Sequence, residues 1–196
     1  MPEPANPRFA VIIPAFNASA TLRQAVDSVL AQTYAPHEII VIDDGSTDAT
    51  AQVARSYGTR VTLISQGNSG VSAARNAGAR AASAEWLCFL DADDWYYPER
   101  LAAYAGMIRE APDLDFLTGD FDYVDAQGNH LRRSMESMPA GQAMLARARE
   151  GRAVMEGEVL GDFIGAHFGD THTLTVPRAS FLALGGYPTG SPYART

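Results

Sequence analysis

A chain of 196 residues, 46% of them hydrophobic, can bury a sizeable core in one domain and is too apolar for disorder over most of its length. Its formal net charge of −8 and its pI near 4.9 argue against a protein that binds the phosphate backbone of a nucleic acid. All fifteen basic residues are arginines, which excludes mechanisms that need a lysine amine, such as a Walker-type phosphate loop or a Schiff base.

Short apolar runs alternate with segments of helical spacing through the first 110 residues. The runs are apolar at successive positions, which is typical of strands covered on both faces. Strands separated by helices favour right-handed βαβ units, so we predict a doubly wound α/β fold with a mostly parallel sheet and helices on both faces. The predicted strands are Phe9–Ile13, Glu38–Ile42, Val61–Ile64 and Glu85–Leu90, and the predicted helices are Ala20–Gln32 (N-cap Ser19), Thr47–Tyr57, Val71–Ala82 and Pro98–Arg109.

The rest of the chain is less regular, and we divide the sequence into residues 1–110 and residues 111–196, as two halves of one domain. The letters DAQGNH, with a glycine between polar residues, predict a hairpin turn. The predicted elements here are strands Asp115–Thr118, Phe121–Val124 and Thr173–Val176, a helix around Gln142–Glu150, and a helix Arg178–Leu184 closed by Gly185 and Gly186.

Polar residues follow each strand of the first half, where ligands bind in open parallel sheets. Glycines among them let a ligand approach the backbone. The fold therefore predicts a polar crevice at one sheet edge, made by Pro14-Ala15-Phe16-Asn17, Asp43-Asp44-Gly45-Ser46, Gln66-Gly67-Asn68-Ser69-Gly70 and Asp91-Ala92-Asp93-Asp94.

Several of these residues also have plain structural interpretations. Ser46 could cap the following helix, Phe16 could belong to the core, and Arg75 could be a solvated arginine. The acidic stretch after the fourth strand, residues 91–94, is different, because close carboxylates repel one another and need a partner. A divalent cation with oxygen ligands is the economical partner, and a phosphate group would be its natural second ligand.

The stretches VIIPAFNASATLRQAVDSVLAQTY, EIIVIDDGSTDAT and NSGVSAARNAGARAASAEWLCFLDADD resemble, in this order, the pattern of glycosyltransferase family 2. The resemblance covers about residues 8 to 110. It implies the Rossmann-like GT-A fold and transfer of a sugar from a nucleotide-diphosphate donor, UDP-sugar favoured, with inversion at the anomeric carbon. It also implies Mg²⁺ or Mn²⁺ as cofactor, a saccharide or lipid-linked acceptor, and a setting in cell-envelope polysaccharide synthesis.

The resemblance also assigns expected roles to single residues. Phe16 would lie against the nucleotide base, Asp44, with Asp43 beside it, would accept a hydrogen bond from the base edge, and Arg75 would sit near the base or the diphosphate. Asp91 would face the ribose and share the metal with Asp93. The implied nucleotide-sugar site is Pro14, Phe16, Asn17, Asp43, Asp44, Asn68, Arg75, Asp91, Ala92 and Asp93, with Asp93 and Asp91 as metal ligands.

The general base is the point at which the sequence departs from the family pattern. The segment TLTVPRASFLALGGYPTG resembles the one that precedes a Glu-Asp pair in the family, but no such pair follows before Thr196. An inverting transferase needs a group that takes the acceptor proton. Two interpretations stay open: a truncated, non-catalytic nucleotide-sugar-binding domain, or another base, for which Asp170 beside His172 is the candidate.

Other classes fit less well. A haloacid-dehalogenase-type phosphatase and a receiver domain both need a lysine, and no GxGxxG follows the first strand for a dinucleotide. A nucleotidyltransferase would need a glycine-rich N-terminal loop with arginine and lysine.

We expect Cys88 to be a core residue. We see no leader peptide and no membrane-spanning stretch, so the expected location is the cytoplasm, at the inner face of the membrane where the acceptor is lipid-linked.

Overall fold

The structure is a computed structural model that describes residues 6–125, 127–156 and 170–189. The chain forms two compact units. The first holds the described residues up to Leu117 and from Thr175 onward, and the second is Thr118–Leu174. The division at residue 110 into two halves of one domain stays a prediction, and the final strand and helix of the described chain belong to the first unit.

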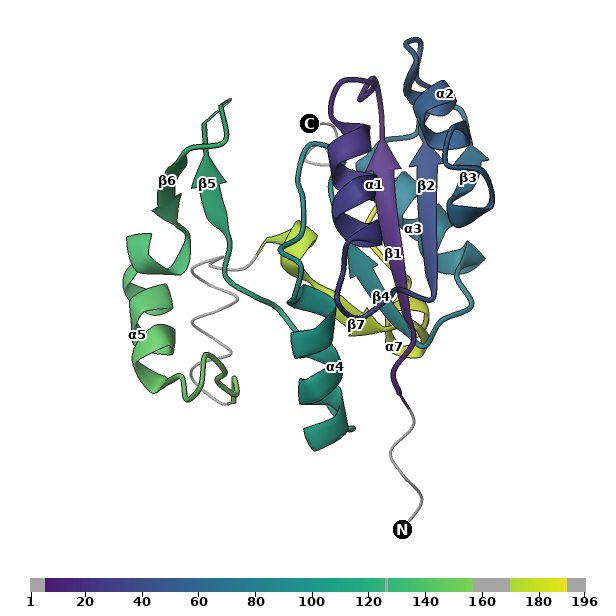
Figure 1. The fold of residues 1–196 in the computed structure, drawn as a ribbon. Coiled ribbons are helices and arrows are strands. Elements are labelled where there is room, and N and C mark those ends of the chain that lie inside the picture. The colour runs from purple at the N-terminus through teal and green to yellow at the C-terminus, as the bar shows by residue number, and fades with distance from the viewer. Residues whose placement is uncertain (1–5, 126, 157–169, 190–196) are drawn as a thin grey trace. The chain divides into compact units, whose positions relative to one another are not determined.

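The first unit is built on a five-stranded sheet with the order β3-β2-β1-β4-β7. Strands β1 to β4 are parallel and β7 is antiparallel to β4, which confirms the predicted mostly parallel α/β fold. Figure 1 shows β1 and β2 running in the same direction, with α1 beside β1. The strands are β1 (Phe9–Ala15), β2 (Glu38–Asp43), β3 (Thr62–Ser65), β4 (Trp86–Phe89) and β7 (Thr175–Pro177).

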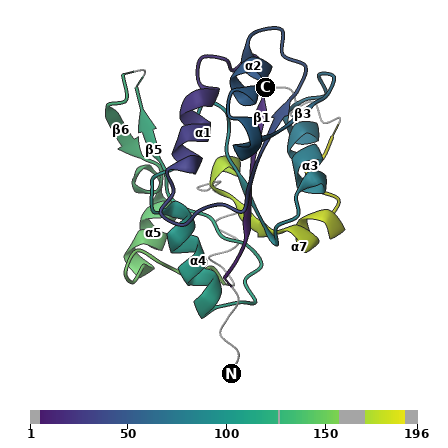
Figure 2. The same ribbon diagram turned by 45° about the vertical axis from the view of Figure 1, so that its right-hand side comes forward.

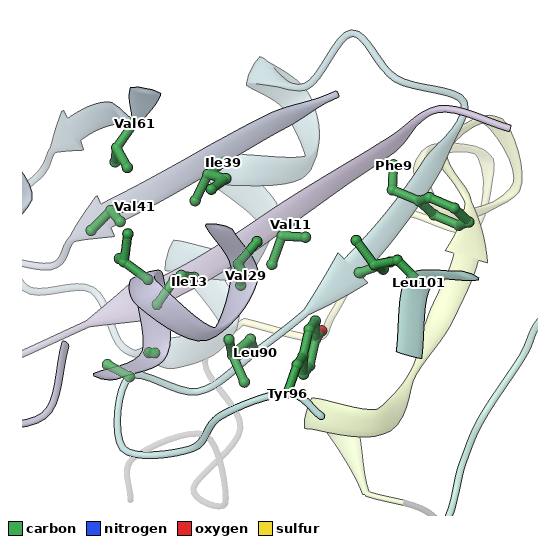
Figure 3. Close-up of a cluster of buried hydrophobic side chains, with 14 of the residues drawn as sticks. Phe9, Val11, Ile13, Val29, Ile39, Val41, Val61, Leu90, Tyr96 and Leu101 are labelled. Carbon is green, nitrogen blue, oxygen red and sulfur yellow. The ribbon is translucent and has the colours of Figure 1, made fainter. Parts of the chain in front are cut away.

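Helices cover both faces of this sheet because alternate residues of β1 point to opposite sides. Phe9, Val11 and Ile13 belong to one core cluster with residues of α1 and α4, as Figure 3 shows for Val29 and Leu101. Figure 2 separates α1 on one side of β1 from α3 and α7 on the other. The helices of this unit are α1 (Leu22–Leu30), α2 (Thr50–Arg55), α3 (Val71–Ala81), α4 (Arg100–Glu110) and α7 (Arg178–Ala183), with the short 3₁₀ turn η1 (Gly58–Arg60) after α2.

The opposite core face depends on a glycine of α3. A Cβ atom at Gly78 would lie 2.4 Å from Cγ2 of Ile12, so α3 can approach β1 only where a residue lacks a side chain.

Cys88 is fully buried, as expected, and Thr175 of β7 donates a hydrogen bond to its sulfur. Burial raises the pKa of this thiol to about 11, which fits a core residue and not a nucleophile.

Three helices begin later than the sequence predicts. The structure places the start of α1 at Leu22 with Thr21 at the N-cap position, so the prediction of Ser19 as N-cap was wrong. The reason is that the Ser19 N–H donates to Asp48, which holds the preceding loop outside the helix. Helix α2 begins at Thr50 and α4 at Arg100 for related reasons, because the residues before them make contacts with other loops.

Two strands differ from expectation because of their positions in the sheet. β3 lies at the edge and is only partly buried, so it is not the doubly covered strand we predicted. Of the predicted strand Asp115–Thr118, only Leu117 pairs, through an isolated antiparallel bridge to Thr175.

The second unit holds the predicted hairpin and a small methionine cluster. Asp125 closes the hairpin turn by accepting from the backbone N–H groups of Gln127 and Asn129. Met135 and Met144 pack together, which puts Gly141 so close to the Met135 backbone that a Cβ atom would lie 2.4 Å from its carbonyl oxygen. The elements are β5 (Asp122–Val124), β6 (His130–Arg133), η2 (Met135–Ser137), α5 (Pro139–Arg147) and η3 (Thr171–Thr173).

Within the described ranges, none of the helices has the length and hydropathy that crossing a bilayer requires.

Candidate functional site

The parallel register brings the ends of the strands to one edge of the sheet. Ala15 of β1 lies opposite Asp43 of β2, and Asp43 lies opposite Ser65 of β3. On the other side of β1, Ile12 pairs with Phe89 at the end of β4. The polar residues that follow each strand therefore gather at this edge, as the apolar runs predicted.

The loop after β1 is fastened to the turn after β2. Asn17 has a positive φ of 50°, a conformation in which asparagine is enriched, and its side-chain oxygen accepts from the Thr47 N–H. Its own N–H donates to the Ser46 hydroxyl, and the Ala18 N–H donates to the Thr50 hydroxyl. Phe16, which precedes this fastened stretch and follows the buried residues Pro14 and Ala15, is 50% exposed. Its ring therefore lies outside the core.

Asp48, which sequence reasoning missed, joins the same two loops. Its carboxylate accepts from the Thr50 hydroxyl over 2.5 Å, from the Thr50 N–H and from the Ser19 N–H. These hydrogen bonds, led by that of Thr50, hold the pKa of Asp48 well below its ordinary value. The signal in the sequence was an aspartate two residues before a threonine at a helix start, a common capping arrangement.

Asp44 is buried at the N-terminus of α3. One oxygen of its carboxylate accepts from Gln66 Nε2 at 2.7 Å and from the Ser69 N–H at 2.9 Å, and the other accepts from the Gly70 N–H at 2.8 Å. A carboxylate offers about four acceptor positions, and donors from the described residues fill three of them. Asp43 has a different task, since its carboxylate accepts from the Ser46 N–H and closes the turn.

A glycine allows the turns after β2 and β3 to touch. Gly45 has φ +78°, and a Cβ atom there would lie 2.7 Å from the backbone nitrogen of Asn68. Asn68 itself is exposed at this edge. Any other residue at position 45 would strain the backbone and push the two turns apart.

Arg75 and Asp91 form an ion pair across the site. Nη2 of Arg75, on α3, donates to Oδ1 of Asp91, just after β4, over 2.5 Å, with the two side chains 10% and 30% exposed. Arg75 is therefore not the solvated arginine that its position alone would suggest. Its buried Nε makes no hydrogen bond within the described part of the chain. A polar group that accepted from this Nε–H would offset the free-energy cost of burying it away from water.

The acidic stretch after β4 keeps carboxylates close together. The Asp94 N–H donates to the Asp91 carbonyl, and carboxylate oxygens of Asp91 and Asp94 lie within 4.8 Å of each other. Between them Ala92 is buried and Asp93 is exposed. Oxygen donors from carboxylates are the ligands that Mg²⁺ and Mn²⁺ prefer, so the chemistry of this set fits the implied cation.

Ser28 of α1 and Gln32, just beyond the end of α1, hold the segment that follows the acidic stretch. The buried Gln32 donates from Nε2 to the Tyr97 carbonyl and accepts at Oε1 from the Leu101 N–H, the start of α4. The Ser28 hydroxyl accepts from the Tyr96 N–H. Sequence reasoning missed both residues, because they lie 65 to 69 positions away from their partners and show no local motif.

Asp170, the candidate base, lies in the second unit. Its side chain accepts from the Thr171 N–H and forms a reciprocal capping box with Thr173 at the start of η3. This is a structural function that the GDTH letters also allow, and it leaves the role of Asp170 as a base a prediction.

Solved structures share this architecture. S. aureus TarS 1-349 in complex with UDP-GlcNAc has a TM-score of 0.68 at 21% identity, over 96% of this chain and 51% of that one. The mannosyltransferase PcManGT from Pyrobaculum calidifontis in complex with GDP-Man and Mn²⁺ has a TM-score of 0.64 at 21% identity, over 97% and 50%. At this identity the likeness concerns the fold, which is that of a GT-A glycosyltransferase.

The family follows from the sequence. The pattern described as Glycosyl transferase family 2 matches residues 10–169, more than half of the chain, and the chain belongs to this family. An uncharacterized glycosyltransferase of Rickettsia felis is 35% identical over 129 residues, 64% of this chain and 21% of that protein. The chain thus spans about a fifth of this relative's length.

Proposed function

We propose that the chain binds a nucleotide-diphosphate sugar, UDP-sugar favoured, at the carboxyl edge of its sheet, as the donor site of an inverting, metal-assisted glycosyltransferase. The observation that carries the proposal is the Arg75–Asp91 pair, which joins a buried cation to the acidic stretch at the edge where Phe16 is exposed. An aromatic face, a guanidinium and several carboxylates match a base, a diphosphate and a cation respectively.

The nucleoside end would lie between the loops after β1 and β2. Phe16 offers an exposed ring for base stacking, and Pro14 and Asn17 set the course of its loop. Asp44 would offer a further acceptor position to an N–H of the base, beside Asn68, while Asp43 supports the turn. We favour uridine because of the resemblance to the family; the ring N–H that uracil and thymine carry between two carbonyl groups fits such an acceptor.

The diphosphate end would lie at the acidic stretch. Arg75 would approach a phosphate oxygen, Asp91 and Asp93 would hold the cation with Ala92 between them, and the free oxygen of Asp91 would face the ribose. A bound Mg²⁺ or Mn²⁺ neutralises the diphosphate and improves it as a leaving group. The nearby Asp94 is a further oxygen donor on the same turn.

Two of the solved relatives carry ligands of this class, UDP-GlcNAc in TarS and GDP-Man with Mn²⁺ in PcManGT. They support a nucleotide-sugar and divalent-metal site for this chain, and they differ in the nucleotide. The acceptor would be a saccharide or a lipid-linked sugar. The proton on its attacking hydroxyl needs a base, for which Asp170 is our candidate.

Calorimetric titration tests the proposal. The chain is titrated with UDP, GDP and dTDP, each with and without Mn²⁺. We expect UDP to bind most tightly and only with the metal present. If none of the three nucleotides binds in either condition, the donor-site proposal is wrong.

A second measurement separates the enzyme from a binding module. Release of UDP from UDP-sugars, with and without simple saccharide acceptors, is followed over time. Turnover supports the enzyme, whereas binding without any turnover favours the alternative of a non-catalytic nucleotide-sugar-binding domain.

A further inference from the structure

Two neighbouring residues of α3 reach in different directions to segments that are far apart in the chain. Arg75 pairs with Asp91 after β4, and Asn76 bonds to Tyr187 after α7, 111 residues further along. The Arg75–Asp91 contact has an obvious place in the donor site. The Asn76–Tyr187 contact is not one of the ligand contacts that we propose for this site.

Asn76 holds the backbone of Tyr187 at both polar groups. Its Nδ2 donates to the Tyr187 carbonyl at 2.8 Å, and its Oδ1 accepts from the Tyr187 N–H at 2.8 Å. The asparagine is only 6% exposed, so both bonds are sheltered from water. A side-chain amide carries its donor and its acceptor on separate atoms, as this contact requires, whereas an ionised aspartate could not donate.

The chain before Tyr187 is shaped to fit this contact. Gly185 and Gly186 have φ values of +86° and +74°, and a Cβ atom at Gly186 would lie 2.4 Å from Oδ1 of Asn76. The Gly186 N–H donates to the Phe181 carbonyl and so ends α7. The two glycines therefore turn the backbone directly onto the asparagine.

The contact places the ring of Tyr187 beside Arg75. The guanidinium carbon of Arg75 lies 5.5 Å from the Tyr187 ring centroid, a cation–π distance. Phe89 of β4 and Phe181 of α7 support the ring from other sides at 5.3 and 5.4 Å. Arg75 is thus held between an aromatic face and a carboxylate, which restricts a side chain that otherwise has many rotamers.

We propose that Asn76 is a positioning residue of the donor site: it fixes Tyr187 so that the aromatic ring holds Arg75 on Asp91, ready for the diphosphate. This inference rests on the proposed function for its ligand. We call Asn76, Tyr187 and Arg75 the clamp. The inference predicts that the clamp affects binding of the diphosphate end. Recognition of the nucleoside by the loops after β1 and β2 should stay unchanged.

The test compares uridine with UDP and Mn²⁺ in matched variants. Asn76→Asp keeps the acceptor and replaces the donor by a repulsion with the Tyr187 carbonyl, so we expect UDP to bind roughly tenfold more weakly and uridine to bind as in the wild type. Tyr187→Leu should have the same effect, and Tyr187→Phe, which keeps the ring, should not. Asn6→Asp, an exposed position before the start of β1, controls for the added charge.

A second readout needs no nucleotide. In the free protein, the Arg75 Nε–H resonance should carry a ring-current shift that is lost in Asn76→Asp and Tyr187→Leu and retained in Tyr187→Phe. An unchanged resonance in the first two variants, or equal weakening of uridine and UDP, would overturn the inference. If the resonance responds but the wild type binds no nucleotide, the clamp stands and the proposed function fails.

Discussion

Nη2 of Arg75 lies 2.5 Å from Oδ1 of Asp91 and joins helix α3 to the acidic stretch that follows β4. The pair engages one oxygen of the Asp91 carboxylate, and we propose that the other oxygen serves a ligand. In the proposed complex, Arg75 would contact the phosphate, and Asp91, which is paired with it, would bind the cation.

Removing the arginine should destabilise the fold. Asp91 is 30% exposed, so without Arg75 it keeps a partly buried charge, and we expect Arg75→Met to lower the free energy of unfolding by roughly 1–3 kcal/mol. Asp91→Asn in the same background should restore part of this loss. Urea unfolding of the two single variants and the double variant measures the coupling. Arg80→Met, an exposed arginine on the same helix, is the control, and strictly additive effects would argue against the pair.

Asp48 should stabilise the protein above acidic pH. Its pKa is lowered in the folded state, chiefly by the Thr50 hydroxyl, so its contribution is present above the ordinary value of 3.8 and is lost as the pH falls below that value. Asp48→Asn should therefore be less stable than the wild type at pH 7, and the gap should narrow on acidification. Urea midpoints between pH 7 and pH 3 measure this, with the exposed Asp113→Asn as control. A gap independent of pH would contradict the assignment.

Asp120 should behave in the opposite way. Burial raises its pKa above 3.8, although the N–H groups of Met135 and Phe121 act against this. The protonated form is favoured in the folded state, so stability is full below pH 3.8 and declines as the pH rises through the folded pKa. Asp120→Asn keeps the acceptor and removes the charge, and we expect a higher urea midpoint at pH 7 with no gain at low pH. Asp125→Asn, at a carboxylate whose pKa is lowered, should instead lower the midpoint.

The arrangement of the sheet could be predicted because it follows from local patterns. The apolar runs and the helices between them indicate that β1 to β4 are parallel, and the polar residues after each run then meet at one edge, whereas the order of the strands in the sheet comes from the structure alone. This argument places Phe16, Asp44 and Asp91 at that edge, and the resemblance to glycosyltransferase family 2 adds Arg75.

The contacts themselves could not be predicted, because they join residues far apart in sequence. Ser19 looked like a helix cap by its neighbours, but its N–H is bound by Asp48, 29 residues away. Gln32 and Asn76 read as ordinary helix residues, and only the folded chain shows that they fasten the segments after β4 and α7. The edge position of β3 was likewise a property of the whole sheet.

We propose that the acidic stretch binds a metal together with a nucleotide, and a substitution of Asp93 tests this proposal. The side chain is exposed and makes no hydrogen bond or ion pair within the described residues, so its loss should leave the fold intact. We would titrate the wild type, Asp93→Ala and the control Asp113→Ala with UDP in the presence of Mn²⁺, after matching their urea midpoints. We expect metal-dependent binding in the wild type and the control and none in Asp93→Ala. Undiminished binding by Asp93→Ala would contradict the account.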